Sequence, residues 1–144
     1  MDKVLLPQAH KFAIRVYYED TDAAGIVYYA NYLRFAERGR TEMLRRTAPQ
    51  YCNPGTSGGI AFAVRHCTAD FIQAGRLDDC LEVHTRIVNV GGASFTVGQT
   101  IVRGDEVLVR LDVRLACINA AGRPERIPAE LHASLEALSV SQGS

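Results

Sequence analysis

Residues 17–44 read YYEDTDAAGIVYYANYLRFAERGRTEML: they enter as the end of a strand, pass through an acidic loop with one glycine, and continue as a helix. Three carboxylates, those of Glu19, Asp20 and Asp22, stand directly before that helix. The start of a helix exposes unpaired backbone N–H groups and carries a partial positive charge. The stretch therefore predicts a place where a carboxylate and backbone donors face a carbonyl group or a small anion.

Helical spacing begins at Tyr28 and continues to about residue 47. The polar side of this helix consists of Arg34, Glu37, Arg38, Thr41, Arg45 and Arg46, and the apolar side of Tyr32, Leu33, Ala36, Met43 and Leu44. Gly39 lies mid-helix, where glycine costs about 1 kcal/mol relative to alanine. We expect a close approach of the helix to a sheet to be the reason for this glycine, and we expect Pro49 to end the helix.

The rest of the chain alternates with the period of strands. The predicted strands are residues 11–18, 60–72, 80–90, 93–103 and 106–118, and a second short helix is expected at 129–138. Turn signals at Gly91-Gly92 and Gly104-Asp105 join the last three strands, which must then pair antiparallel. This order predicts an α+β arrangement, an antiparallel sheet of about five strands wrapped around one long helix, in a single domain spanning 1–144.

Composition excludes several classes of protein. Formal net charge is zero, which gives no electrostatic argument for binding nucleic acid or an anionic membrane. No apolar run has the length of a signal peptide or a membrane span, so we expect a cytoplasmic protein with no integral membrane segment. The four cysteines form no C-x-x-C pair and the histidines are scattered, so we predict no metal site and reduced, partly buried thiols.

The block YxDTDxxGxVYxxxYLxFxExxRTExL resembles the 4-hydroxybenzoyl-CoA thioesterase branch of the hotdog-fold thioesterases, and more closely the Tol-Pal-associated acyl-CoA thioesterases of bacteria. The segments ADFIQAGRLDDCLEVHTRI and NAAGRPERIP are similar to later parts of the same family. The resemblance implies a hotdog fold and hydrolysis of acyl-CoA thioesters. It also implies a homo-oligomer, a dimer or a tetramer, with active sites between subunits. No separate cofactor is implied, because coenzyme A is part of the substrate.

The resemblance also assigns roles within the block. The second aspartate is the catalytic carboxylate in the family, which corresponds to Asp22. The backbone N–H that polarises the thioester carbonyl corresponds to Tyr29, where relatives often carry histidine. The residues alone leave two roles open for Asp22, direct attack on the carbonyl or activation of water, and also permit an ordinary Asx-turn or N-cap residue.

Further residues are candidates for holding the substrate. Near the block these are Gly25, Val27 and Tyr28, and elsewhere Arg65, Arg76, Arg123 and Arg126, because a guanidinium suits phosphate geometry. The tyrosines at 28, 29 and 32 either line an acyl pocket or belong to the core. Asn31 either caps the helix or faces the site.

We therefore predict a cofactor-free thioesterase for short-to-medium-chain or aromatic acyl-CoA, with acyl carrier protein thioesters as an alternative substrate. A second class of function is a non-hydrolytic acyl-CoA or acyl-carrier-protein binding partner in phospholipid or envelope biogenesis. The intact carboxylate at Asp22 argues against a pure binding protein. A hotdog dehydratase is the weakest alternative, because that chemistry normally pairs a histidine with a carboxylate, and the block contains no histidine.

Overall fold

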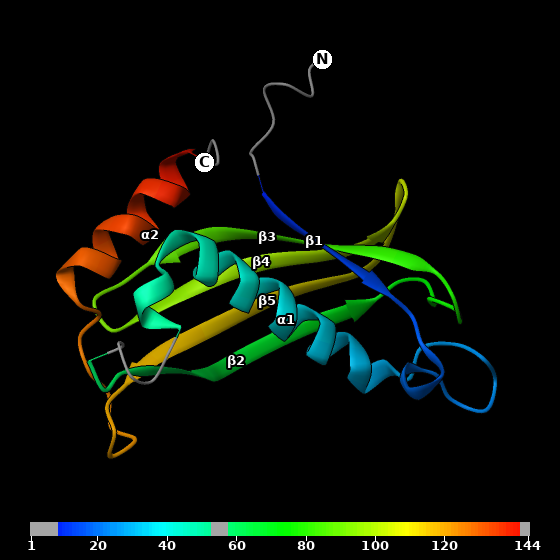
Figure 1. The fold of residues 1–144 in the computed structure, drawn as a ribbon, viewed down its shortest axis with the longest axis horizontal. Coiled ribbons are helices and arrows are strands. Elements are labelled where there is room, and N and C mark those ends of the chain that lie inside the picture. The colour runs from blue at the N-terminus through cyan, green and yellow to red at the C-terminus, as the bar shows by residue number, and fades with distance from the viewer. Residues whose placement is uncertain (1–8, 53–57, 142–144) are drawn as a thin grey trace.

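A computed structural model describes residues 9–52 and 58–141 of the chain (Figure 1). Its strands are β1 (His10–Arg15), β2 (Ala61–Phe71), β3 (Cys80–Val90), β4 (Ser94–Arg103) and β5 (Glu106–Ile118). Its helices are α1 (Tyr29–Thr47) and α2 (Ala129–Ser141), with two short 3-10 turns at Tyr18–Asp20 and Pro49–Tyr51. The strands form one antiparallel sheet in the order β1-β3-β4-β5-β2.

Helix α1 lies across one face of this sheet and packs on β1, β3 and β4 (Figure 1). The core between them contains large side chains that are almost fully buried: Phe35, Met43, Leu81, Phe95, Ile101 and Leu108. Helix α2 packs against β3 and α1 and adds Leu131 and Leu135, both fully buried. The predicted α+β arrangement of five strands around one long helix is confirmed.

Gly39 lies where α1 crosses β3, and this position explains its presence in the middle of a helix. A Cβ atom placed on Gly39 would lie 2.5 Å from Cγ1 of Val83 and 3.3 Å from Oγ1 of Thr85. Both neighbours are fully buried. The predicted close approach of helix and sheet at this glycine is therefore confirmed.

The first strand and the helix faces differ from the sequence prediction. Strand β1 ends at Arg15, and Tyr18 is 81% exposed because it begins a 3-10 turn and does not continue the strand. On α1, Leu33 is exposed, whereas Phe35, absent from the predicted apolar side, is fully buried. Which helix positions are buried depends on the crossing point with the sheet, and local spacing does not give that point.

Strand β2 also departs from simple alternation. Its register against β5 shifts between Val64 and His66, so that one residue is inserted and the faces are exchanged beyond it. Cys67 and Cys80 are exposed, which corrects the expectation of partly buried thiols at these two positions, while Cys117 is buried as expected. No helix among the described residues is long and apolar enough to cross a membrane.

Candidate active site

The acidic loop folds back on itself as a short antiparallel ribbon that leads into α1. Asp20 and Tyr28 are joined by a 2.9 Å bond from the Tyr28 N–H to the Asp20 carbonyl, and Thr21 pairs with Val27. Between these arms the Asp22 N–H donates to the carbonyl of Ile26 at 2.9 Å. The chain reverses direction at Gly25, whose φ is +80°. Residues with a Cβ atom rarely adopt this backbone conformation. The loop is therefore held in one shape by its own backbone.

Asp22 stands at the exposed tip of this ribbon. Its Oδ1 accepts the N–H of Ala24 at 2.8 Å, which is the Asx turn that the sequence allowed. Within the part of the chain that the structure describes, Oδ2 has no hydrogen-bond partner. The local structural role and a reactive carboxylate are thus compatible, because they use different oxygens.

Helix α1 begins at Tyr29, and no side chain caps it. Tyr28, at the N-cap position, has extended backbone geometry and forms no side-chain cap. The backbone N–H of Tyr29 is the first of α1, and the N–H at the very start of a helix finds no acceptor within it. The two arms bring Asp22 opposite Ile26 and Thr21 opposite Val27, so Asp22 stands at the tip of the ribbon that leads directly into Tyr29 at the helix start.

An apolar pocket of about 250 Å³ adjoins the ribbon and the helix start. Its lining consists of Ile26, Val27, Tyr29, Tyr32, Phe71, Ile72, Gln73 and Ala74. The ring of Tyr29 meets that of Phe71 edge-on with centroids 6.0 Å apart. Asp22 adjoins this pocket through its bond to Ile26, one of the lining residues.

The profile of the thioesterase superfamily matches residues 24–110, more than half of the 144 residues. The chain belongs to the thioesterase superfamily. It is 37% identical over 135 residues to the acyl-CoA thioesterase YbgC of Haemophilus influenzae, a match that covers 93% of this chain and 99% of that protein. It is 36% identical over 129 residues to the acyl-CoA thioester hydrolase YbgC of Escherichia coli O157:H7, covering 88% and 95% of the two chains.

Solved structures agree with this membership. A probable thioesterase from Bartonella henselae shares 41% identity at a TM-score of 0.74, covering 83% of this chain and 98% of the other. A Staphylococcus aureus protein solved in complex with CoA reaches a TM-score of 0.87 over 96% and 89% of the two chains, at 13% identity, which shows the fold alone. The predicted family, the hotdog fold and the predicted thioester hydrolase are confirmed.

Within this thioesterase the tyrosines divide between core and pocket. Tyr32 belongs to the core, since only 3% of it is exposed and its hydroxyl accepts the Gly75 N–H at 2.8 Å. Burial raises the pKa of Tyr32, and the hydrogen bond from the Gly75 N–H opposes this effect only in part. Tyr29 lines the pocket and is 60% exposed, whereas Tyr28 is half-exposed and lies outside the lining.

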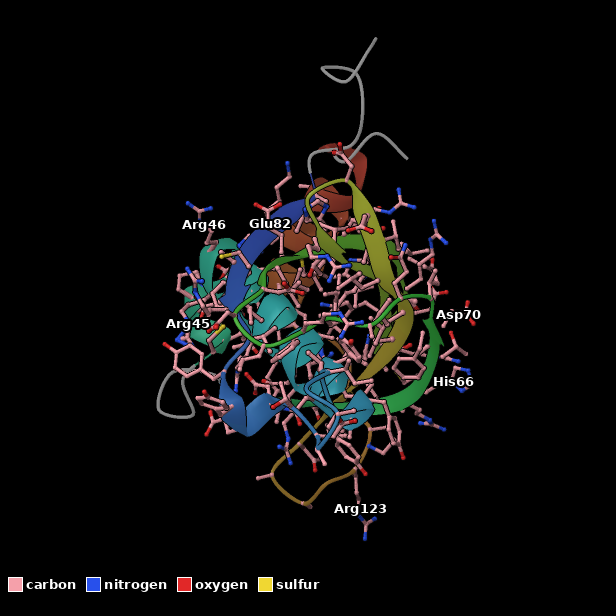
Figure 2. All side chains as sticks on the ribbon, turned by 90° about the vertical axis from the view of Figure 1, so that its right-hand side faces the viewer. Arg45, Arg46, His66, Asp70, Glu82 and Arg123 are labelled. Carbon is pink, nitrogen blue, oxygen red and sulfur yellow. The ribbon has the colours of Figure 1, made fainter. Side chains whose placement is uncertain are left out.

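The arginines predicted to hold phosphate lie at different places. Arg76 is exposed, and its backbone forms an isolated bridge with Ile26 of the ribbon, so it is beside the candidate site. Arg65 is exposed on β2 at the bulge. Arg123 is exposed on the loop between β5 and α2 and points away from the fold (Figure 2). Arg126 is exposed on the same loop as Arg123, with its guanidinium near Gly92 between β3 and β4. Of these four, the structure brings only Arg76 to the ribbon, and phosphate binding stays a prediction for all of them.

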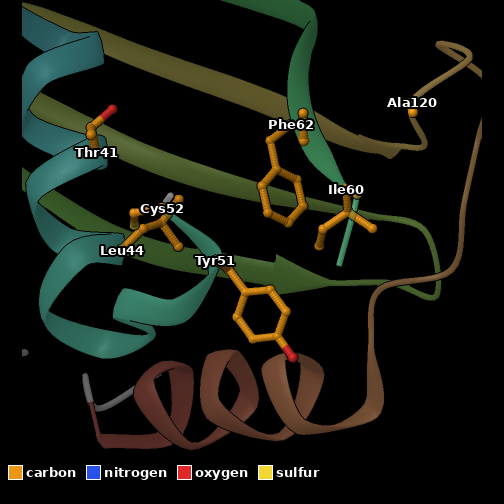
Figure 3. A pocket seen from close by; sticks show the side chains of 9 residues that line it. Thr41, Leu44, Tyr51, Cys52, Ile60, Phe62 and Ala120 are labelled. Atoms are coloured by element: carbon orange, nitrogen blue, oxygen red, sulfur yellow. The ribbon is translucent and has the colours of Figure 1, made fainter. Parts of the chain in front are cut away.

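A second, larger pocket of about 460 Å³ lies near the other end of α1 (Figure 3). Thr41 and Leu44 line it from the helix, Tyr51 and Cys52 from the following turn, and Phe62 from β2. It contains neither Asp22 nor Tyr29. No group of three or more His, Cys, Asp or Glu side chains able to hold a metal ion is present among the described residues.

The ribbon is supported from outside by the segment between β2 and β3. Gly75 accepts the Val27 N–H at 2.8 Å, and Arg103 reaches this segment through its guanidinium. Nη1 of Arg103 lies 2.7 Å from Oδ2 of Asp79 and 3.3 Å from the carbonyl of Ala74. Burial by itself would raise the pKa of Asp79, but the hydrogen bonds and charge of Arg103, with the Arg76 N–H, outweigh it and leave that pKa below its ordinary value.

Replacing Arg103 by methionine removes this ion pair, together with the bond from Nε of Arg103 to Oε1 of Glu106 at 3.0 Å, and keeps the apolar stem. We expect the free energy of unfolding at pH 7 to fall by about 1–3 kcal/mol, the usual range for a charged hydrogen bond. A carboxyl whose pKa is depressed by folding stabilises the protein fully above its unfolded-state pKa, near 3.8 for Asp79, and loses that contribution as pH falls through the folded-state value. Urea unfolding of the wild type and the variant should therefore show a difference in the free energy of unfolding that shrinks below pH 4. A difference in this free energy that does not change with pH would contradict the assigned ion pair.

Proposed function

We propose that this thioesterase hydrolyses acyl-CoA thioesters with the Asp22 carboxylate and the backbone N–H of Tyr29. One observation carries the proposal: a single ribbon carries an exposed carboxylate oxygen at its tip and leads into an uncapped helix start whose first residue lines an apolar pocket. The acyl-CoA activity named for relatives at 36% and 37% identity supports it.

The chemistry follows from what a thioester needs. The carbonyl oxygen gains negative charge as the carbonyl carbon is attacked, and the Tyr29 N–H at the positive end of α1 stabilises that charge. The Asp22 carboxylate either attacks the carbon itself or takes a proton from the attacking water. In both routes the C–S bond breaks, and the products are a carboxylic acid and the free thiol of CoA.

The substrate we propose carries a short-to-medium or aromatic acyl group. The pocket of about 250 Å³ beside Tyr29 is apolar and lined by Phe71 and Ile72, which suits such a group. Arg76, adjacent to the ribbon, is our first candidate for contact with the CoA phosphates, ahead of Arg65, Arg123 and Arg126. An acyl carrier protein thioester offers the same reacting bond and is the alternative substrate.

A substrate panel tests this function. Thiol release is measured on acetyl-, hexanoyl-, decanoyl- and benzoyl-CoA, with an acyl carrier protein thioester of the best acyl group as a further arm. We expect turnover that depends on the acyl group. Binding of acyl-CoA by calorimetry with no thiol release on any member would instead establish the non-hydrolytic binding protein.

We propose further that two copies pair through β2. This strand is 11 residues long, lies at the edge of the sheet and is exposed along most of its length. On the face that carries α1, Val64 is 50% and Phe71 48% exposed, although their partners on β5, Leu115 and Val109, are buried. A long uncovered edge with apolar side chains is a template for pairing with another chain, and a two-fold axis makes that pairing self-complementary.

Replacing Val64 by glutamate is therefore expected to shift the protein from dimer or tetramer towards monomer, because the dimer would bury a charge without a partner. Val88→Glu is the matched control, since Val88 is also 50% exposed but lies on β3, which the proposed contact does not involve. Sedimentation velocity at several concentrations measures the shift. A wild-type monomer at all concentrations would rule out the pairing.

A further inference from the structure

Asp20 and Asn31 form a side-chain pair buried between the acidic loop and the first turn of α1. Asp20 is 5% exposed and Asn31 is 6% exposed. Nδ2 of Asn31 donates to Oδ1 of Asp20 at 2.8 Å, and the N–H of Tyr17 donates to Oδ2 at 2.9 Å. A buried carboxylate is costly unless its oxygens are hydrogen-bonded, and here each oxygen has its own donor.

The pair joins the two arms that carry the proposed reacting groups. Asp20 lies two residues before Asp22, and Asn31 lies two residues after Tyr29. The Tyr28 N–H donates to the Asp20 carbonyl at 2.9 Å, so side chain and backbone of one residue tie the same two arms together. We infer that Asp20 and Asn31 are positioning residues, which set the separation between the Asp22 carboxylate and the Tyr29 amide. The inference rests on the proposed function of those two groups.

The position of Asn31 argues for this role over that of a simple helix cap. A capping side chain stands at the N-cap and accepts N–H groups of its own helix. Asn31 instead lies inside the helix, at its third residue, and its amide donates outward to the loop. The pair therefore fixes the loop against the helix and does not complete the helix itself.

The fold has other supports, so losing this pair should displace the loop without unfolding the protein. The tip of the ribbon keeps its own bonds, from the Asp22 N–H to Ile26 and from the Ala24 N–H to Asp22. Val27 remains tied to the carbonyl of Gly75. Most of the buried core side chains belong to the sheet and the two helices, and Val27 is the member that the ribbon adds.

An exchange of the two residues separates positioning from stability. Asp20→Asn and Asn31→Asp each leave the pair mismatched: the first loses the charge that accepts two donors, and the second sets two carboxylates against each other. The double exchange restores a donor facing an acceptor, because Asn at 20 still accepts the Tyr17 N–H through its oxygen and donates its amide to Asp at 31. A carboxylate also stays near the positive end of α1.

The measurement is kcat and KM on the best acyl-CoA of the panel, together with the melting temperature and the near-ultraviolet circular dichroism of each protein. We expect each single variant to lose about tenfold to a hundredfold in kcat with little change in KM, the scale of a small misplacement of reacting groups. We expect the double exchange to recover most of that loss. Glu82→Gln is the control, since it weakens a side-chain pair of similar length, His84 Nε2 to Glu82 Oε1 at 2.9 Å, on the exposed side of β3.

Three results would overturn the inference: wild-type kcat in both single variants, a fall in activity that only follows the folded fraction, or a folded double exchange that is no faster than the single variants. The test also distinguishes this inference from the function on which it rests. Full activity of Asp22→Asn would remove the proposed function. An inactive Asp22→Asn beside fully active Asp20 and Asn31 variants would remove only the positioning role.

Discussion

Replacing Asp22 by asparagine is expected to lower kcat for acyl-CoA hydrolysis by about a hundredfold or more, the usual scale for the loss of an acid–base group. Asparagine has nearly the shape of aspartate and keeps an oxygen that can accept the Ala24 N–H, so the Asx turn survives. What disappears is the negative charge and the basic oxygen. A direct attack on the carbonyl and the activation of water both require that oxygen, so the expected loss is the same for either route.

The matched control for this prediction is Asp112→Asn. Asp112 is also exposed, but it lies on β5 between two residues buried in the core, so its side chain points to the face of the sheet opposite α1. Both variants lose one carboxylate and the same net charge. Thiol release should fall in Asp22→Asn and stay unchanged in Asp112→Asn. Equal activity in the two variants would assign the reaction to another group.

Replacing Gly39 by alanine is expected to destabilise the protein by about 1–3 kcal/mol, the range for overpacking a tight core. The added Cβ would lie 2.5 Å from Cγ1 and 3.0 Å from Cβ of Val83, inside any normal contact distance. Val83 is fully buried on β3, and a β-branched side chain has few χ1 rotamers with which to give way. The better helix propensity of alanine, worth about 1 kcal/mol, acts in the opposite direction and is included in this expectation.

The double variant Gly39→Ala with Val83→Ala tests the cause. Val83→Ala alone leaves a cavity and destabilises the protein. If the clash is the cause, adding the Gly39 change to Val83→Ala costs less than adding it to the wild type, because the methyl group fills part of the space. Free energies of unfolding from urea titrations give the four corners of this cycle. Additive effects of the two substitutions would show that contact with Val83 is not the cause of the destabilisation.

Much of the architecture could be read from periodicity. The boundaries of β3 and β5 agree with the predicted strands, because short turns mark both ends of these alternating runs. The register shift between β3 and β4 at Ile87 and Asn89 could not be predicted in this way. The extent of β1 could not be read in this way. Tyr18 continues the apolar alternation of that strand, yet it is exposed, because the Asp20 carboxylate binds the Tyr17 N–H and turns the chain.

The site shows the same division. The roles of Asp22 and Tyr29 are predictions from the resemblance of the block to a family, and the residue type of Asp22 allows the Asx turn that the structure shows. Asn31 had two possible roles in the sequence, and only the folded chain shows that it donates to Asp20. Asp20 and Asp22 look alike in sequence, but Asp20 is only 5% exposed, whereas Asp22 stands at the exposed tip of the ribbon.

The sequence by itself determined the family, the order of elements, and the place where a carboxylate precedes a helix start. These features depend on residue type and on spacing along the chain, which are local. The tertiary structure decided which acidic residue is buried, which face of α1 meets the sheet at Gly39, and that Phe71 of β2 meets Tyr29 in one pocket. Those outcomes depend on contacts between segments far apart in the chain, and such contacts are fixed only when the sheet and the helix pack together.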